Sequence, residues 1–315
     1  MPTRQTGLYI NKEKRNRKTV WQNGVKLMNN KKEKLICVLG PTASGKTKLS
    51  VDLAKEINAE IISADSMQIY KEMNIASAKP TKEEMDGIKH YLIDEVSLNS
   101  NFSVYDYVKS ANSAFDEIIN CGKKVILCGG TGLYIDSFIN NISFSETEVD
   151  FELREKLNKR AQVYGGDALL KELSSIDKEY AERLHPNNIK KIVRALELYY
   201  TNQKTMTEQL KDSRVNPSRF DTLFIGLNYK CRDTLYDKIN CRVDVMVENG
   251  LIEESRSIFD PGYNATGCAA IGYKELIPYF EGKTSKEEAI EKIKRETRRY
   301  AKRQLTWFRR NKDIN

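Results

Sequence analysis

The sequence has no CxxC pair, although six cysteines are spread along its 315 residues. Structural zinc sites use closely spaced thiols, so this absence argues against a zinc site. A disulfide framework is also unexpected, because disulfides of that kind stabilise small secreted domains and not chains of this length. We therefore expect reduced thiols and a cytoplasmic protein.

Long apolar runs and internal repeats are absent too, and proline and glycine are sparse. No stretch approaches the roughly 18 apolar residues that a membrane-spanning helix needs. The basic N-terminal segment lacks the apolar stretch of a signal peptide. These absences favour a globular protein outside the membrane, with one large domain or two smaller ones.

Charge is distributed unevenly along the chain. The formal net charge is +8, and residues 1–34 alone hold ten Lys or Arg and two acidic residues. Residues 290–315 are also basic, with ten Lys or Arg and three acidic residues. The middle of the chain is therefore acidic. Basic ends indicate a polyanionic partner, although a solvated tail and a solvated helix face would have the same composition.

Hydrophobic patterning predicts strands that alternate with helices. Short apolar runs predict strands at 34–40, 61–63, 124–128 and 220–227. Apolar residues at helical spacing predict helices at 46–57, 102–120, 232–259 and 285–310. This alternation is typical of a doubly wound α/β fold, in which helices flank a parallel sheet.

The segment 146–212 differs from its surroundings, because it is highly charged and has helical periodicity. We predict an all-helical insertion domain there, within an α/β core made of residues 34–145 and 213–315. The polar, basic residues 1–33 have no periodicity and are predicted to be a disordered extension.

An anion-binding motif follows the first predicted strand. The sequence GPTASGKT fits GxxxxGK[ST], with a strand before it and a helix after it. Glycines let backbone amides turn toward an anion, the lysine adds charge, and the last hydroxyl can hold Mg²⁺. The motif predicts a P-loop that binds a di- or triphosphate, with Mg²⁺ at Thr47, through Gly40, Pro41, Thr42, Ala43, Ser44, Gly45, Lys46 and Thr47.

The position of the nearest carboxylate separates this chain from common P-loop enzymes. Kinases and NTPases usually place an acid at the end of a later strand to hold Mg²⁺. The third predicted strand ends in Cys128 and Gly129, whereas Asp65 follows the second strand. Ligands of open α/β sheets bind beyond the strand ends, where Asp65 would act as a base beside a diphosphate. Taken alone, Asp65 is also compatible with a helix N-cap.

A series of motifs resembles the tRNA dimethylallyltransferase family. The phosphate loop is followed by DSMQIY at 65–70, AKP at 78–80 and GGTGLY at 129–134. Later matches are HPNN at 185–188, RALE at 194–197, Arg242 with Met246, IGYKE at 271–275 and RYAKRQLTWFR at 299–309. The resemblance spans residues 35–310. It departs from the family in the N-terminal 33 residues, and at Lys190 and Lys191, where the family often has Gln or Arg.

This resemblance implies a P-loop fold and transfer of a dimethylallyl group from dimethylallyl diphosphate to N6 of adenosine 37 in tRNA. It implies Asp65 as the base, Thr131 as a hydrogen-bonding group, and Arg242 and Mg²⁺ as stabilisers of the leaving diphosphate. The target adenosine is expected to flip out of its stack, with Gln68 bonding to its edge. A monomer is expected, and the implied tRNA contacts are Asp65, Ser66, Met67, Gln68, Thr131, Arg154, Lys190, Lys191, Ile192, Val193 and Arg194.

Other interpretations remain open at this point. Thr131 can be a turn residue, Arg242 a surface ion-pair partner and Gln68 an exposed polar residue. The final helix is expected to pack in the core and to lie near RNA, with Tyr300 and Trp307 packing. For the whole chain, the alternatives are a small-molecule P-loop transferase, such as an adenylate isopentenyltransferase or a nucleoside-type kinase, and a non-catalytic RNA-binding protein.

Overall fold

A computed structural model describes residues 32–144, 150–259 and 270–314. Most of the predicted N-terminal extension therefore lies outside the described residues. Glu33, which the prediction placed in that extension, is instead the first residue of strand β1, Glu33–Leu39. The reason is tertiary: Glu33 N donates to Arg219 O at 3.1 Å, and Glu33 pairs in register with Phe220.

The fold is built on a five-stranded sheet in the order β3-β2-β4-β1-β5. Every pairing in it is parallel, and Ile36 at its centre aligns with Ile126 on one side and Leu223 on the other. The predicted α/β class is confirmed. The edge strand β3 was not predicted, because two residues give no periodicity. The other strands are β2 Ala59–Ala64, β3 His90–Tyr91, β4 Lys124–Gly129 and β5 Phe220–Gly226.

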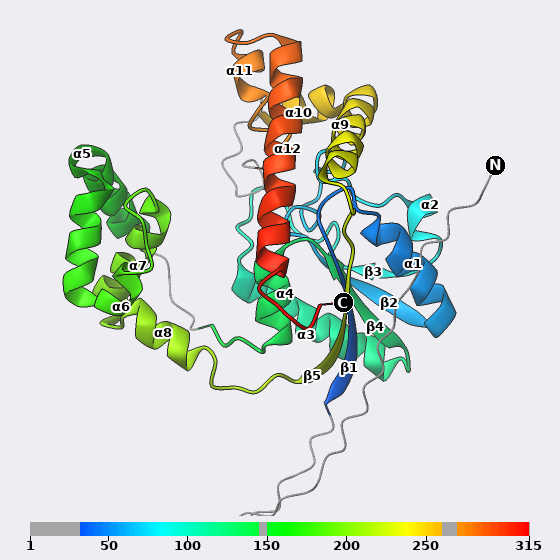
Figure 1. Cartoon of the computed structure of the whole chain (residues 1–315), viewed down its shortest axis with the longest axis horizontal. Coiled ribbons are helices and arrows are strands. Elements are labelled where there is room, and N and C mark those ends of the chain that lie inside the picture. Colours follow the sequence, from blue (N-terminus) through cyan, green and yellow to red (C-terminus); the bar gives the residue numbers. More distant parts are fainter. Residues whose placement is uncertain (1–31, 145–149, 260–269, 315) are drawn as a thin grey trace, which may run out of the picture. The chain divides into compact units, whose positions relative to one another are not determined.

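Helices cover both faces of this sheet (Figure 1). Along β1, Leu35, Cys37 and Leu39 belong to the core under α3 and α4, whereas Val38 packs with α1 on the opposite face. This alternation follows from the two-residue repeat of a strand. The helices concerned are α1 Lys46–Ile57, α3 Val104–Asn120 and α4 Gly132–Ile139, and the short α2 is Lys82–Met85.

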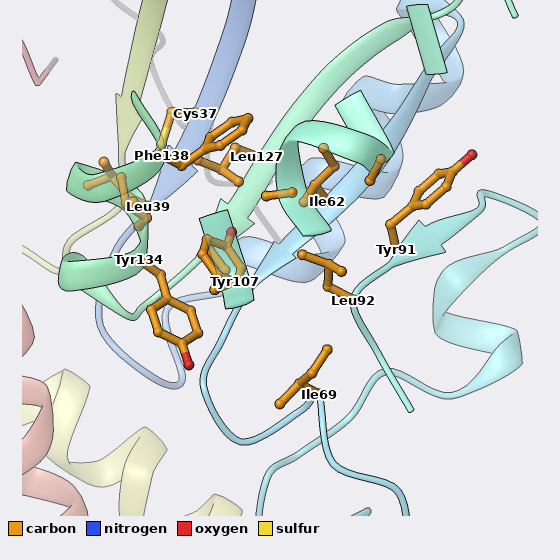
Figure 2. Close-up of a cluster of buried hydrophobic side chains, with 14 of the residues drawn as sticks. Cys37, Leu39, Ile62, Ile69, Tyr91, Leu92, Tyr107, Leu127, Tyr134 and Phe138 are labelled. Carbon is orange, nitrogen blue, oxygen red and sulfur yellow. The ribbon is translucent and has the colours of Figure 1, made fainter. Parts of the chain in front are cut away.

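The larger core fixes the end of β2, from which the loop with Asp65 begins. Tyr107 of α3 and Tyr134 of α4 stack with ring centroids 4.1 Å apart (Figure 2). The buried Tyr107 hydroxyl donates to Ser63 O at 3.2 Å. A stacked, fully buried aromatic pair therefore holds the strand two residues before Asp65.

The C-terminal part of the chain is helical. The predicted helix 232–259 is in fact two helices, because Gly250 takes a left-handed φ of 96° between them. The last helix, α12, begins at Lys286 with a capping box between Ser285 and Glu288. These helices are α9 Arg232–Glu248, α10 Leu251–Phe259, α11 Ile277–Phe280 and α12 Lys286–Phe308.

The described residues of the predicted insertion are helical: α5 Phe151–Ile176, which is kinked at Gly165, α6 Lys178–Ala181, α7 Ile189–Asn202 and α8 Met206–Asp212. Leu157, Leu169, Leu173, Ile192 and Leu196 belong to a hydrophobic cluster of their own. The assignment of 146–212 as a separate domain remains a prediction. None of the described helices is both long and apolar enough to cross a membrane.

Candidate active site

The phosphate loop joins β1 to α1, as its sequence predicts. Gly45 precedes α1 with a left-handed φ of 87°, and no side chain caps the helix there. The first amides of α1 therefore remain available to an anion, which the helix dipole also favours. Gly40 is needed for space, because a Cβ at this position would lie 2.6 Å from Leu227 O.

Lys46 lies within this loop and is held by it. Its Nζ donates to Pro41 O at 2.8 Å. Burial lowers the pKa of Lys46 to about 8, while Cys128 and Asp65 oppose that shift and Arg242 adds to it. A buried ammonium group next to a second cation is poorly compensated by protein groups, so an anionic ligand would stabilise both charges.

Arg242 reaches the same loop from α9. Its Nη1 donates to Thr42 Oγ1 at 3.4 Å, across 200 residues of sequence. Burial lowers the pKa of Arg242, and the negative charge of Asp65 opposes this. The surface ion pair that the sequence left open is therefore wrong for this side chain. Lys46 and Arg242 bring two positive charges to one phosphate-sized region.

Asp65 lies in a turn after β2, and not at the start of a helix. Its Oδ1 accepts from Met67 N at 2.9 Å and from Gln68 N at 3.4 Å. Thr131 holds the next residue, because its Oγ1 accepts from Ser66 N at 3.1 Å. Two strand ends thus fix the orientation of the Asp65 carboxylate, and Thr131 acts on it through Ser66.

Gln68 is engaged within the protein. Its Nε2 donates to Ser77 O at 3.3 Å and to Ala78 O at 3.1 Å, and its Oε1 accepts from Ser63 Oγ at 3.2 Å. Both amide hydrogens are therefore used, and the side chain ties β2 to the loop at 77–78. Bonding to an adenine edge would require Gln68 to exchange one of these partners.

Lys46, Asp65, Gln68 and Arg242 line one cavity of about 320 Å³, whereas Thr131 is not in its lining. The cations in its lining are Lys46, Arg242, Lys274 and Arg303, and the Thr47 hydroxyl and the Asp65 carboxylate lie in the same lining. An apolar portion comes from Val243 and Met246 of α9 and from other helices. The cavity therefore combines a place for a diphosphate, an apolar wall and a carboxylate. Its further lining residues include Thr42, Ser66, Met67, Ala76, Ser77, Ala78, Cys128, Gly129, Ile239, Leu251, Ile271, Ile293 and Tyr300.

The last helix, α12, lines this cavity with residues that were missed as site residues: Ile293, Thr297, Tyr300, Arg303 and Gln304. Tyr300 and Gln304 are four residues apart, hence on one face of the helix, and both line the cavity. Burial and the charge of Asp65 raise the pKa of Tyr300, so its phenol stays protonated. The sequence assigned Tyr300 to packing. The available signal in the sequence was an uncharged glutamine in an otherwise highly charged helix. Trp307 does pack, and its Nε1 donates to Asp136 Oδ2 at 2.7 Å.

The predicted tRNA contacts in the insertion fall into three groups. Lys190 and Lys191 are exposed on α7. Ile192 and Val193 are 0% and 3% exposed and pack in the hydrophobic cluster of these helices. Arg154 forms a bidentate pair with the buried Glu197, at 2.8 to 3.1 Å. Arg194 contributes to the same carboxylate at 3.2 Å.

A protein-built metal site is not found among the described residues, where no three His, Cys, Asp or Glu side chains converge. Thr47 and Asp65 nevertheless place two oxygen-bearing side chains in the cavity beside Lys46. Such a donor set suits Mg²⁺, which often takes one or two protein ligands and completes its shell with phosphate oxygens and water.

Comparison with known proteins supports a family assignment. The family model described as IPP transferase matches residues 68–311. A tRNA dimethylallyltransferase of Acetivibrio thermocellus is 48% identical over 284 residues, which are 90% of each chain. One of Bacillus anthracis is 46% identical over 90% of each chain.

Solved structures agree with this assignment. The tRNA isopentenylpyrophosphate transferase of Bacillus halodurans superposes with a TM-score of 0.67 at 44% identity, covering 90% of this chain and 89% of its own. A eukaryotic dimethylallyltransferase acting on tRNA has a TM-score of 0.74 at 30% identity, covering 88% of this chain and 70% of its own.

Proposed function

The chain belongs to the IPP transferase family, and from this premise we propose that it transfers a dimethylallyl group from dimethylallyl diphosphate to N6 of adenosine 37 in tRNA. Diphosphate is the second product. The observation that carries the proposal is the shared cavity, in which Lys46 and Arg242 lie with Asp65. The names of its relatives, which act on tRNA, support the acceptor.

The basic end of the cavity would hold the leaving group. As the bond between C1 and the bridging oxygen breaks, its electron pair goes to the diphosphate. The uncapped amides at the start of α1, together with Lys46 and Arg242 of the cavity lining, would stabilise this growing charge. Groups held in position before the reaction stabilise such charge without reorganising.

The acceptor amine needs a base. As the N6 lone pair forms the new bond to C1, the nitrogen loses a proton, and Asp65 is the carboxylate in the cavity that can accept it. The two hydrogen bonds to Oδ1 orient the Asp65 carboxylate, and the side chain still lines the cavity. Thr131 serves this step as a positioning residue, through Ser66 N.

We also propose that Mg²⁺ accompanies the diphosphate. The Thr47 hydroxyl, with the diphosphate oxygens, would hold the ion, and Asp65 lies in the same cavity. When bound, the ion would neutralise the negative charge of the leaving diphosphate.

The RNA is proposed to bind through exposed basic groups, since phosphate contacts give affinity that depends on salt and not on sequence. Lys190 and Lys191 are the clearest candidates in the insertion. Adenosine 37 would leave its stack to reach the cavity, where Ser66, Met67 and Gln68 form the lining next to Asp65.

Asp65→Asn tests this function. With Mg²⁺, labelled dimethylallyl diphosphate and unmodified tRNA, wild type should transfer label to the RNA. The variant should lose about 10²- to 10⁴-fold in kcat, as expected for a removed general base. Its Kd for tRNA should stay within about twofold, because the amide keeps the shape and the Oδ1 bonds.

Asp52→Asn is the matched control, since Asp52 is an exposed carboxylate on α1. It should behave as wild type. Label that enters AMP and not tRNA would replace the proposal by a small-molecule transferase. A near-normal kcat for Asp65→Asn would disprove the role of the base.

A further inference from the structure

The phosphate loop is held by a side chain far away in sequence. Gln304 of α12 is 5% exposed, and its Oε1 accepts from Thr42 N at 2.9 Å. Its Nε2 donates to Gly130 O at 3.0 Å. A buried amide whose two ends both have main-chain partners is strongly fixed in orientation.

The peptide group that Gln304 holds is also the one that binds Lys46. Thr42 N and Pro41 O belong to the same peptide unit, and Lys46 Nζ donates to Pro41 O at 2.8 Å. A trans peptide is planar, with its N–H and C=O pointing in opposite directions. Fixing the N–H therefore fixes the carbonyl, and with it the resting position of the Lys46 ammonium group.

The turn after β4 is shaped to receive this helix. A Cβ on Gly130 would lie 2.2 Å from Gln304 Nε2, and a Cβ on Gly132 would lie 2.3 Å from Trp307 Cδ1. Both glycines are thus required for the close approach of α12. The contact of Gln304 with the loop depends on the helix lying directly against this turn.

We infer that Gln304 is a positioning residue for the diphosphate site: its amide orients the Pro41–Thr42 peptide and thereby Lys46. The inference rests on the proposed function for the identity of the diphosphate substrate. It assigns to α12 a role in the phosphate site in addition to packing. Gln304 itself need not touch the substrate.

The test uses Gln304→Met, which keeps the volume and loses both hydrogen bonds. Binding of inorganic diphosphate with Mg²⁺ should weaken about tenfold, the scale of a lost hydrogen bond that organises a charged site. KM for dimethylallyl diphosphate should rise by a similar factor. The Kd for tRNA should change less than about twofold.

Thr306→Val is the control on the same helix, because the exposed Thr306 bonds only to Lys302 O of its own helix among the contacts described. It should leave diphosphate binding unchanged. Unchanged diphosphate affinity in Gln304→Met would overturn the inference. Equal weakening of tRNA and diphosphate binding would also overturn it, since that is the result of a generally loosened fold.

A double-mutant cycle makes the test independent of stability. Gly130→Ala should weaken diphosphate binding, because the new methyl group would push the Gln304 amide aside. In a protein that already carries Gln304→Ala, the same substitution should weaken diphosphate binding much less. Additive effects would contradict the inference. Wild type that binds diphosphate but does not label tRNA would remove the proposed function and leave this inference standing.

Discussion

Two glycine-rich turns end neighbouring strands of the sheet, and glycine has a different purpose in each. In the loop after β1, Gly45 has a left-handed φ of 87°, and a Cβ there would meet nothing within 4 Å. In the turn after β4, Gly130 and Gly132 leave room for side chains of α12. The first turn needs the backbone conformation of Gly45 as well as space at Gly40 beside Leu227 O, whereas the second turn needs space for α12.

This difference separates the chemical duties of the two turns. The first is proposed to present helix amides and Lys46 to a diphosphate, and both lie at one end of the cavity described above. The second binds the protein to itself: Thr131 holds Ser66, and Gly130 O accepts from Gln304. Similar glycine patterns in sequence therefore do not indicate two phosphate sites.

Lys46→Ala should give the largest effect, because it removes a buried cation from the first turn. We expect kcat/KM for dimethylallyl diphosphate to fall about 10³-fold, on the scale of a lost stabiliser of transition-state charge. Steady-state kinetics with saturating tRNA would measure it. Lys48→Ala, an exposed lysine two residues later, should match wild type. A Lys46→Ala rate within tenfold of wild type would remove the first turn from the mechanism.

Gly132→Ala should mainly lower stability, because the new methyl group would overlap with Trp307. We expect a loss of about 2 kcal/mol in the free energy of unfolding, measured by urea denaturation. Leu133→Ala, at a 47% exposed position next to it, should cost less than about 0.5 kcal/mol. Gly45→Ala should cost about 1 kcal/mol from its backbone alone. A larger loss at Gly45 than at Gly132 would reverse the distinction between conformation and space.

The smallest predicted effect is a pH dependence in the first turn. With its pKa lowered to about 8, Lys46 loses its proton in the free protein as pH rises through 8. Bound diphosphate should favour the protonated form of Lys46. The affinity for diphosphate should therefore fall between pH 7 and 9, by a few-fold more in wild type than in Lys46→Arg. Calorimetry in buffers of different ionisation enthalpy should show proton uptake near pH 8.

The stability of the folded protein should change with pH in the direction opposite to that expected for a salt-bridged lysine. Between the folded pKa of about 8 and the ordinary value of 10.5, the unfolded chain binds more protons at Lys46. The free energy of unfolding should therefore rise with pH across this window, and Lys46→Ala should lack this contribution. Parallel pH profiles of the two proteins would contradict the lowered pKa.

Much of the fold could be predicted from local pattern. Helix α1 begins and ends where the spacing of apolar residues predicts, and four of the five strands were found within a few residues. Short-range signals of this kind depend on neighbours in sequence. They failed where a partner far away decided the outcome, as for Glu33 in β1 and for the two-residue strand β3.

The phosphate loop and Asp65 were readable from the sequence because each is a contiguous motif at a strand end. The occupied amide of Gln68, the buried Ile192 and the Arg154–Glu197 pair were not readable, since each depends on which residues become neighbours. Local motifs predicted which groups would bind a diphosphate and accept a proton. The contact of α12 with the loop was decided by tertiary packing. Gln304 lies more than 250 residues from Thr42, and their hydrogen bond of 2.9 Å leaves no periodic pattern in the chain.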